Sequence, residues 1–449
     1  MSFSLRNYQV ELITNIKQSI LKGNRSIIVQ SPPRSGKTVV MAHIAKGATD
    51  KGNKVLFFSH RKEINEQVKK TFELNDVNLN LVTIDGVQTL VRKLDDLEEP
   101  EIILIDEAHH SKANSYIKII NHFPNALKLL FTGTPIRLNG DGFDDIADDL
   151  ILGKTVKWLQ DHGNIAPFKY YAPSMIDTSK LKKRGGEFTK DSIDDSLKSV
   201  IYGDVIKHYK ELADGKQAIV YTHSIKSAEQ VADEFNQNGY KAIAISGKTH
   251  KTERDSAMQE FRDGTLTIMV NCELFTEGID LPNVDVCIML RPTQSLSLYL
   301  QFAMRPLNPR KDKTAIIIDH VANVERFGLP NMDRDWLLSG VETKKQKAKI
   351  GEPTTRTCDM CFATYWSAER MCPLCGHQNE ITERELEEIK EARLEEIREE
   401  KQLRLTEKVK KYRKPSDCLN MEELTEYRKQ RGYKPGWQYH VAKQLKFIY

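Results

Sequence analysis

The sequence predicts an α/β protein with two parallel-sheet domains, a small four-cysteine module and a helical C-terminal tail. Short apolar strands alternate with helices of amphipathic spacing over residues 1–165 and again over residues 201–345. This alternation is typical of parallel sheets covered by helices. Four of the seven cysteines fall between residues 358 and 375, which predicts a module at 350–380, and charged residues dominate the chain from 380 to 414. Residues 381–449 are therefore expected to form a charged helix and a tail.

The expected strands follow from apolar runs bounded by turn residues. In the first domain these runs lie at 26–29, 54–58, 79–83, 102–105 and 128–132, and in the second at 218–221, 242–245, 267–270, 284–289 and 315–318. Residues 166–200 break the alternation and are expected to connect the two domains. Their basic segment, 180–186, either contacts a nucleic-acid backbone or is a solvated linker.

Composition limits the classes of function. A chain of 449 residues is long enough for several domains, and its net charge of +4 means that nucleic-acid binding needs locally basic surface. No apolar run is long enough to span a membrane and the first residues do not resemble a signal peptide, so a cytoplasmic location is expected.

The segment Ser31-Pro-Pro-Arg-Ser-Gly-Lys-Thr38 lies between an apolar strand and the start of a helix. Backbone N–H groups of Ser35 and Gly36 at such a helix start can cradle nucleotide phosphates. Lys37 can reach the outer phosphates, and the Thr38 hydroxyl can ligate Mg²⁺. The full pattern has glycine where this chain has Ser31, and Arg34 stands where a second glycine is common. The alternative is an ordinary strand-turn-helix with a surface lysine.

A second strand, at 102–105, ends in the carboxylates Asp106 and Glu107. Carboxylates at a strand end can hold Mg²⁺ through water, which is the role expected of Asp106. Glu107 is expected to orient and deprotonate an attacking water. Their combination with Lys37 and Thr38 favours a site that hydrolyses a nucleoside triphosphate over two surface carboxylates.

Together these motifs resemble superfamily 2 helicases of the DEAH-box type over about residues 5–320. The resemblance implies two RecA-like domains and ATP as the nucleotide. It implies that residues 5–9 form the adenine-reading segment, with Gln9 as the reader and Arg6 as a further nucleotide-binding residue. It also implies that Gly278 and Asp280 line the nucleotide site from the second domain. Coupling of hydrolysis to domain motion is assigned to His109, Thr132, Thr134 and Gln301. Contacts to the nucleic-acid strand are assigned to Ser59, His60, Arg61, Gln88 and Thr89 in the first domain and to Thr222, Thr276 and Glu277 in the second.

The last helicase motif, residues 301–305, implies an arginine finger at Arg305. The family usually has glycine before this arginine and a second arginine three residues later, whereas this chain has Met304 and Asn308. Arg305 is then the single finger in register, or Arg310 takes the second place. An arginine supplied from across the cleft only when the domains close would link hydrolysis to movement along a strand.

Cys358, Cys361, Cys372 and Cys375 form two Cys-x-x-Cys pairs ten residues apart. Four thiolates at this spacing are typical of a structural zinc ribbon, with Gly376 permitting a tight turn. Iron in a rubredoxin-like site is the alternative, and zinc is favoured because nothing else in the chain indicates electron transfer.

The tail contains Arg431-Gly-Tyr-Lys-Pro-Gly-Trp437, in which two aromatic rings stand beside cations. Together with the ribbon, this tail resembles RadD-like bacterial helicases and related phage-encoded DEAH helicases. That resemblance implies docking of the acidic tail of the single-stranded DNA-binding protein. The alternative is that Tyr433 and Trp437 only pack within the fold.

We therefore expect an ATP-dependent DNA helicase or translocase that acts on single-stranded, forked or branched DNA in replication, recombination or repair, in a bacterial or phage-infected cell. The alternatives are a duplex translocase or branch-migration motor, an RNA helicase, and a binding scaffold switched by ATP. Glu107 and Arg305 argue against the scaffold, because binding alone requires neither residue. A restriction-enzyme motor is less favoured because no nuclease-like segment accompanies these motifs.

Overall fold

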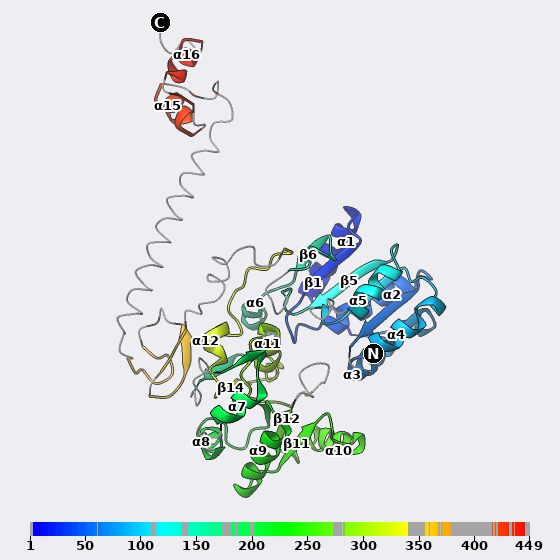
Figure 1. Cartoon of the computed structure of the whole chain (residues 1–449), viewed down its shortest axis with the longest axis vertical. Coiled ribbons are helices and arrows are strands. Elements are labelled where there is room, and N and C mark those ends of the chain that lie inside the picture. Colours follow the sequence, from blue (N-terminus) through cyan, green and yellow to red (C-terminus); the bar gives the residue numbers. More distant parts are fainter. Residues whose placement is uncertain are drawn as a thin grey trace. The chain divides into compact units, whose positions relative to one another are not determined.

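The structure is a computed structural model of the 449-residue chain. It describes residues 3–60, 62–108, 114–136, 142–172, 181–184, 187–197, 202–272, 281, 283–339, 355–358, 360–366, 369, 371–378, 415, 418, 421–430, 433–434 and 436–444. The chain divides into two compact units, Met1–Gln378 and Asn379–Tyr449. The first unit contains two six-stranded sheets (Figure 1).

The first sheet has the strand order β3-β2-β4-β5-β1-β6, and its pairings are all parallel. Its strands are β1 (Ser26–Gln30), β2 (Val55–Ser59), β3 (Val82–Gly86), β4 (Ile102–Ile105), β5 (Leu127–Thr132) and β6 (Asp149–Leu152). The helices of this region are α1 (Asn7–Leu21), α2 (Lys37–Thr49), α3 (Lys62–Leu74), α4 (Val87–Lys93), α5 (Asn114–His122) and α6 (Val156–Asp161), with 3₁₀ turns η1 (Leu79–Leu81) and η2 (Leu94–Asp96).

Alternation along the strands divides the first core into two layers. Ile27 and Val29 of β1 pack with apolar residues of α1, α2 and α3, whereas Ile28 between them packs with residues of α4 and α5. Successive strand side chains point to opposite faces, so a fully buried strand needs apolar residues at every position. This requirement explains why β1 and β4 read as continuous Ile, Leu and Val runs.

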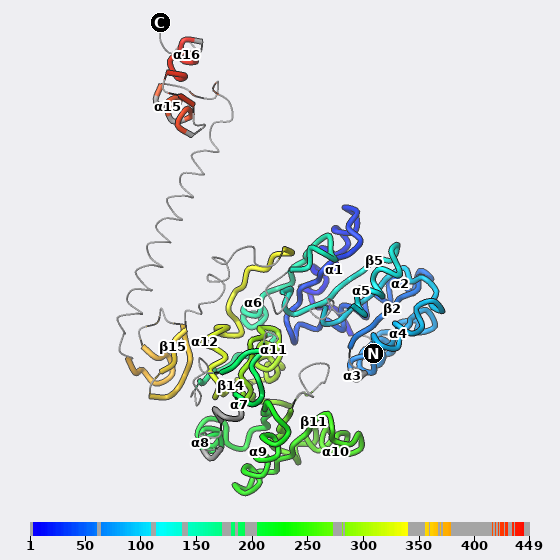
Figure 2. Tube along the Cα trace, in the orientation of Figure 1, coloured from blue at the N-terminus to red at the C-terminus, as the bar shows by residue number. Residues whose placement is uncertain are grey.

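The second sheet has the order β11-β12-β10-β13-β14-β7 and is also parallel in its pairings. Its strands are β7 (Phe168–Tyr171), β10 (Ala218–Thr222), β11 (Ala242–Ser246), β12 (Ile268–Cys272), β13 (Val286–Met289) and β14 (Ala315–Asp319). The associated helices are α7 (Lys190–Leu197), α8 (Tyr202–Ala213), α9 (Ile225–Gln237), α10 (Lys251–Arg262), α11 (Leu296–Ala303) and α12 (Asn323–Phe327). In Figure 2 the blue-to-cyan part of the chain builds the first sheet, and the green-to-yellow part builds most of the second.

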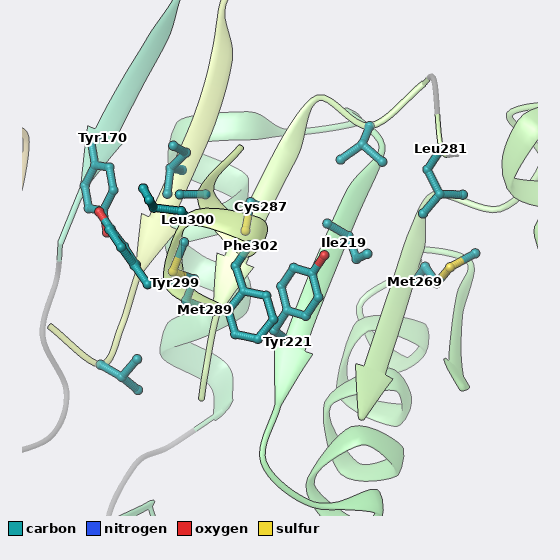
Figure 3. Packing of buried hydrophobic residues seen from close by; sticks show 14 of the residues in the cluster. Tyr170, Ile219, Tyr221, Met269, Leu281, Cys287, Met289, Tyr299, Leu300 and Phe302 are labelled. Atoms are coloured by element: carbon teal, nitrogen blue, oxygen red, sulfur yellow. The ribbon is translucent and has the colours of Figure 1, made fainter. Parts of the chain in front are cut away.

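One face of the second sheet is covered by α8 and α9, and the other by α10, α11 and α12. Figure 3 shows from close by the core on the face covered by α10, α11 and α12, where the rings of Tyr221 and Phe302 are stacked. Their centroids lie 3.9 Å apart at an interplanar angle of 18°. This contact fixes α11 against β10, and the chain reaches Arg305 two residues after α11 ends.

The structure differs from the sequence-based expectation at several elements. Residues 79–81 form η1, and the strand begins only at Val82. The short strand β6 was not expected. Residues 166–200 are more than a connection, because β7 pairs with β14 at the edge of the second sheet and a small hairpin follows, formed by β8 (Lys183–Arg184) and β9 (Glu187–Phe188).

A buried carboxylate ties β7 to β14. The Tyr170 hydroxyl donates to Asp319 Oδ2 at 2.8 Å, and the backbone N–H groups of Val321 and Val324 also donate to this carboxylate. Burial raises the pKa of Asp319 to about 6, and these hydrogen bonds oppose the rise. Because a buried carboxylate needs such donors, they stabilise its charged form at neutral pH.

The cysteine module packs on the edge strand β7. Its two short strands, β15 (Thr355–Thr357) and β16 (Thr364–Trp366), are antiparallel. Ala363 forms a bridge with Tyr171, and the Ala172 N–H donates to the Phe362 carbonyl at 2.9 Å. The module thus covers a sheet edge that would otherwise expose unpaired backbone groups.

The second unit contains α15 (Met421–Gln430) and α16 (Trp437–Gln444). The Trp437 ring stacks on Tyr427 at 5.7 Å and lies 4.6 Å from the Tyr433 ring. These aromatic rings therefore pack on one another, and docking of the single-stranded DNA-binding protein stays a prediction. The expected helix at 380–414 and the tail residues Arg431, Gly432 and Pro435 lie outside the described residues. No described helix has the length and apolar character that crossing a membrane requires.

Tyr170→Phe is expected to lower the free energy of unfolding by about 1–3 kcal/mol near neutral pH, because it removes a donor from a buried carboxylate. Folding raises the Asp319 pKa, so this group contributes stability that is lost as the pH rises through about 6. Removing the Tyr170 donor raises the Asp319 pKa further, so the variant loses more stability as the pH rises. The difference in free energy of unfolding between variant and wild type should therefore be smaller at about pH 5 than at about pH 7.5. Urea unfolding of Tyr170→Phe and of the neighbouring control Tyr171→Phe measures the difference. Equal defects in the two variants would contradict the assignment.

Candidate nucleotide site and cysteine cluster

The loop after β1 turns sharply into α2. Gly36 is the N-cap residue of α2 and has φ 81°, and Lys37 is the first residue of the helix. Positive φ is inexpensive only for glycine. A Cβ at Gly36 would also come within 2.5 Å of the Gln9 side-chain nitrogen. The backbone conformation therefore disfavours larger residues at this position, and a Cβ there would displace the Gln9 side-chain amide.

The start of α1 holds this loop. The Tyr8 hydroxyl donates to the Ser35 carbonyl at 2.9 Å, and Gln9 Nε2 donates to the same oxygen at 3.1 Å. The side-chain oxygen Oε1 of Gln9 accepts a hydrogen bond from the Arg6 backbone N–H at 2.9 Å, and the Arg6 side chain donates to Asn164 Oδ1 at 3.1 Å. The structure thus brings the predicted Gln9 and Ser35 together. Sequence reasoning missed Tyr8, whose position one residue before Gln9 was the available signal.

The Lys37 ammonium lies between two carboxylates from the end of β4. Its Nζ is 2.7 Å from Glu107 Oε1 and 3.4 Å from Asp106 Oδ1, and the three side chains are about nine-tenths buried. Burial alone would lower the pKa of Lys37, but Asp106 and Glu107 outweigh it and raise the pKa above its usual value. Burial raises the pKa of Asp106, and Lys37 opposes that rise.

Glu107 has φ 52°, a left-handed conformation that is strained for a residue with a Cβ. Its backbone N–H donates a hydrogen bond to Asp106 Oδ1 at 2.9 Å, and this bond holds the conformation of the turn. The adjacent carboxylates therefore stand in a fixed turn beside Lys37. Strained residues of this kind are common at functional sites.

The end of β5 lies between the two motifs. The Ser31 N–H donates to the Thr132 carbonyl at 2.9 Å, and a Cβ on Gly133 would meet the Pro33 ring at 3.0 Å. Thr132 Oγ1 donates to the Thr134 carbonyl and accepts the Thr134 N–H. The predicted coupling residue Thr132 is therefore bonded to the phosphate loop, and Thr134 is bonded to Thr132. Thr38 lies in the first turn of α2 and is half-buried.

In the second domain, Gln301 and Arg305 are both 8% exposed. The Arg305 carbonyl accepts a hydrogen bond from Arg34 Nη2 at 2.9 Å, which joins the loop after β1 to the chain after α11. Asn308 donates to the Leu281 carbonyl at 3.2 Å, and Arg310 forms an ion pair with Asp285. The side chains of Asn308 and Arg310 therefore both have partners within the second domain.

The residues predicted to contact nucleic acid divide into two groups. His60, Gln88 and Thr89 lie at the carboxyl ends of β2 and β3 and are exposed or half-buried. Ser59 and Thr222 are buried, with hydroxyls that donate to Asn65 at 2.7 Å and to the Ser224 and Asn271 carbonyls at 3.2 Å. In this structure those hydroxyls donate hydrogen bonds to other groups of the protein. The predicted residues Arg61, His109, Thr276, Glu277, Gly278 and Asp280 lie outside the described residues.

The four clustered cysteines come together. Their sulfur atoms all lie within 4.8 Å of one another, and the pairs Cys358–Cys375 and Cys361–Cys372 are 3.5 and 3.6 Å apart. Four thiolates around a zinc ion at about 2.3 Å would have sulfur atoms roughly 3.8 Å apart. Gly376 has φ 73°, as the expected tight turn requires. The donor set and spacing fit a four-coordinate zinc site.

The nucleotide site combines a glycine-turned helix start, a buried lysine and two carboxylates at the carboxyl ends of parallel strands. Ligands of open α/β sheets bind at this edge. A helix N-terminus with a lysine suits phosphate, and adjacent carboxylates suit a divalent cation. The fold and site together define a nucleoside-triphosphate-binding protein with two parallel-sheet domains.

Comparisons with known proteins agree with this class. Residues 201–308 match the family described as "Helicase conserved C-terminal domain". Residues 2–80 and 73–137 match the family described as "Type III restriction enzyme, res subunit". The two matches fall on the second and first sheets respectively.

Relatives extend the similarity. A 51.5 kDa protein of a Lactococcus phage is 42% identical over 359 residues, which cover 80% of this chain and 79% of the phage protein. A Saccharomyces cerevisiae protein named as an ATP-dependent helicase, IRC3, is 27% identical over 72% of this chain and 51% of its own length. The DNA 3'-5' translocase XPB2 of Sulfurisphaera tokodaii is 24% identical over 71% of this chain and 81% of its own length. The chain therefore spans only about half of the yeast relative.

Two solved structures share the fold. A fragment described as the HsdR subunit of a Vibrio vulnificus type I restriction enzyme has a TM-score of 0.57 at 18% identity, covering 71% of this chain and 64% of that one. The DNA-bound restriction-modification enzyme LlaBIII has a TM-score of 0.54 at 14% identity, covering 71% of this chain and 28% of that one. The chain belongs to the ATP-hydrolysing superfamily 2 helicases and is related to the 51.5 kDa protein of a Lactococcus phage. This family implies ATP and Mg²⁺ as its nucleotide and cation.

Gly36→Ala is expected to lower the free energy of unfolding by about 1–2 kcal/mol, because alanine is strained at positive φ. The clash with Gln9 adds to that cost. Gly47→Ala in the same helix is the matched control, since nothing lies within 4 Å of its Cβ position and alanine favours a helix. Urea unfolding of both variants measures the effect. A Gly36→Ala protein as stable as Gly47→Ala would refute the described turn.

Proposed function

We propose that the chain is an ATP-dependent DNA helicase or translocase that acts in replication, recombination or repair. The observation that supports this proposal best is the Lys37 ammonium held between Glu107 and Asp106, with the second domain bonded to the same loop through Arg34 and Arg305. A site of this kind can respond to the relative position of two domains. Coupling to domain motion is what a motor needs beyond hydrolysis.

In the proposed reaction, backbone N–H groups at the start of α2 bind phosphate oxygens and Lys37 neutralises their charge. Thr38 and Asp106 would hold Mg²⁺, which would supply further charge neutralisation. Glu107 then releases Lys37 and accepts a proton from the attacking water. Gln9 would read the adenine, because its amide already lies against the loop at Ser35.

Arg305 is proposed as the finger that approaches the nucleotide from the second domain. Its burial near Tyr221 means that its guanidinium must move before it can contact phosphate. Hydrolysis would then depend on closure of the domains, and reopening after hydrolysis would advance the protein along its strand. Contacts mainly to the backbone imply little sequence preference.

Exposed polar and basic residues and the name of one relative support DNA as the nucleic acid along which the protein moves. His60 and Gln88 are exposed beside one another at the carboxyl edge of the first sheet, and Lys182, Lys183 and Arg184 are exposed in the small hairpin of the second domain. The name of XPB2 describes a DNA translocase. The second candidate is a duplex translocase that moves without separating strands, and the word translocase in that name agrees with movement along DNA.

The test is ATPase stimulation measured side by side with single-stranded DNA, duplex, forks, four-way junctions and RNA, together with strand-displacement assays. Stimulation by single-stranded or forked DNA with strand displacement supports the helicase. Duplex stimulation without displacement supports the translocase. Stimulation by RNA alone would overturn the DNA assignment, and no stimulation by any nucleic acid would overturn the motor.

Lys37→Ala and Glu107→Gln are expected to abolish turnover by different routes. Lys37→Ala should weaken nucleotide binding, whereas Glu107→Gln should retain binding and reduce kcat by at least about 10²- to 10⁴-fold. ATPase assays and binding of a fluorescent nucleotide separate the two effects, with Glu73→Gln on the exposed face of α3 as control. Near-normal hydrolysis by Glu107→Gln would exclude it as the base.

We also propose that Cys358, Cys361, Cys372 and Cys375 bind one structural zinc ion. The spacing of the four sulfur atoms supports this proposal. All four donors come from the chain, which leaves no open position for chemistry. Because the module packs on β7, zinc would also hold the edge of the second sheet.

Cys358→Ser is expected to lose the zinc and to unfold the module locally, because metal binding and folding are coupled in so small a structure. Metal analysis of the purified protein should give one zinc per chain for the wild type and for the control Cys418→Ser, whose thiol lies in the second unit. Finding iron, or finding full zinc in Cys358→Ser, would reject the proposed site.

A further inference from the structure

Arg34 occupies a backbone conformation that is unfavourable for it. Its φ is 68°, in the left-handed region, and it lies two residues before Gly36 in the loop after β1. A residue with a Cβ typically costs about 1–2 kcal/mol in this conformation, whereas glycine is tolerated there. An arginine at this position therefore indicates that its side chain makes an interaction that glycine could not make.

That side chain reaches the second domain. Arg34 Nη2 donates to the Arg305 carbonyl at 2.9 Å, and the two residues are 271 positions apart in the chain. The bond joins the phosphate-binding loop directly to the backbone that carries the proposed finger. Any shift of one against the other must stretch or break it.

The Arg305 and Arg34 guanidinium groups both lie near the Tyr221 hydroxyl. Burial raises the pKa of Tyr221 to about 12, and the two arginines oppose this rise. The Tyr221 ring is in turn fixed by its stack on Phe302 of α11. Arg34, itself half-buried, thus lies near the stacked rings of Tyr221 and Phe302, which Figure 3 shows.

The described contacts of Asn308 and Arg310 differ from that of Arg34. Asn308 donates to the Leu281 carbonyl, and Arg310 pairs with Asp285, which also pairs with Lys313. These contacts all lie within the second domain. Arg34 is the arginine whose described contact crosses between the phosphate loop and the finger segment.

We propose that Arg34 is a positioning residue that sets the Arg305 backbone relative to the phosphate loop, so that the finger enters the nucleotide site in register when the domains close. This inference rests on the proposed role of Arg305. A guanidinium suits the task because its N–H groups have a rigid geometry. Small errors in the placement of a catalytic group can cost up to about 100-fold in rate.

The test begins with Arg34→Gly, which removes the guanidinium and also relieves the strained conformation. We expect unfolding in urea to be unchanged or to need more denaturant. We expect kcat for nucleic-acid-stimulated hydrolysis to fall about 10- to 100-fold while KM for ATP changes less than about threefold. Arg34→Lys should restore part of kcat, and the control Arg262→Ala, at an exposed position in the last turn of α10, should match the wild type. An Arg34→Gly enzyme with normal kcat, or one altered only in KM, would overturn the proposal.

A double-mutant cycle with Arg305→Ala shows whether Arg34 acts through the finger. In single-turnover hydrolysis at high enzyme concentration, Arg34→Gly should lower the rate of the Arg305→Ala protein less than about twofold. A full additional loss would overturn the positioning role. If Arg305→Ala itself hydrolyses ATP normally, the finger assignment fails. If Arg305→Ala is inactive and Arg34→Gly is normal, only the present inference fails.

Discussion

The ion pair between Lys37 and Glu107 is the interaction that brings the other features of the site together. It links a helix that follows β1 with a turn that follows β4, and β5 lies between these strands. The ammonium can span that distance only because all three strands are parallel and end at one edge. Glu107 compensates the buried charge of Lys37, which would otherwise be costly. In the proposed mechanism, nucleotide phosphate replaces Glu107 at Lys37 and so frees the proposed base.

The second sheet contributes through a small number of contacts. Tyr221 on β10 stacks with Phe302 of α11, and the chain then passes through Arg305, whose carbonyl binds Arg34. The edge of this sheet is held by the Tyr170–Asp319 bond and covered by the cysteine module. A movement of the phosphate loop can therefore displace the backbone of the second domain through the hydrogen bond from Arg34 to Arg305. The position of that bond in turn depends on the stability of the second domain.

Sequence patterns predicted the central strands and the nucleotide motifs because both depend on local chemistry. Buried parallel strands need continuous apolar runs, and Gly36-Lys37 and Asp106-Glu107 are recognisable at strand ends. Two edge strands were missed, because β6 is short and β7 lies among prolines and polar residues, so neither shows a clear period. The burial of Ser59 and Thr222, the Tyr8 contact and the bond from Arg34 to Arg305 depend on residues distant in sequence. Local spacing holds no information about such partners.

We propose that Lys37 exchanges Glu107 for nucleotide phosphate in a site formed by both domains. A crystal structure with Mg²⁺ and a non-hydrolysable ATP analogue is the direct test of this exchange. We expect phosphates at the start of α2, Lys37 Nζ bonded to their outer oxygens, and Glu107 facing the terminal phosphate. An analogue bound elsewhere, or Lys37 still paired with Glu107 beside a bound nucleotide, would contradict it.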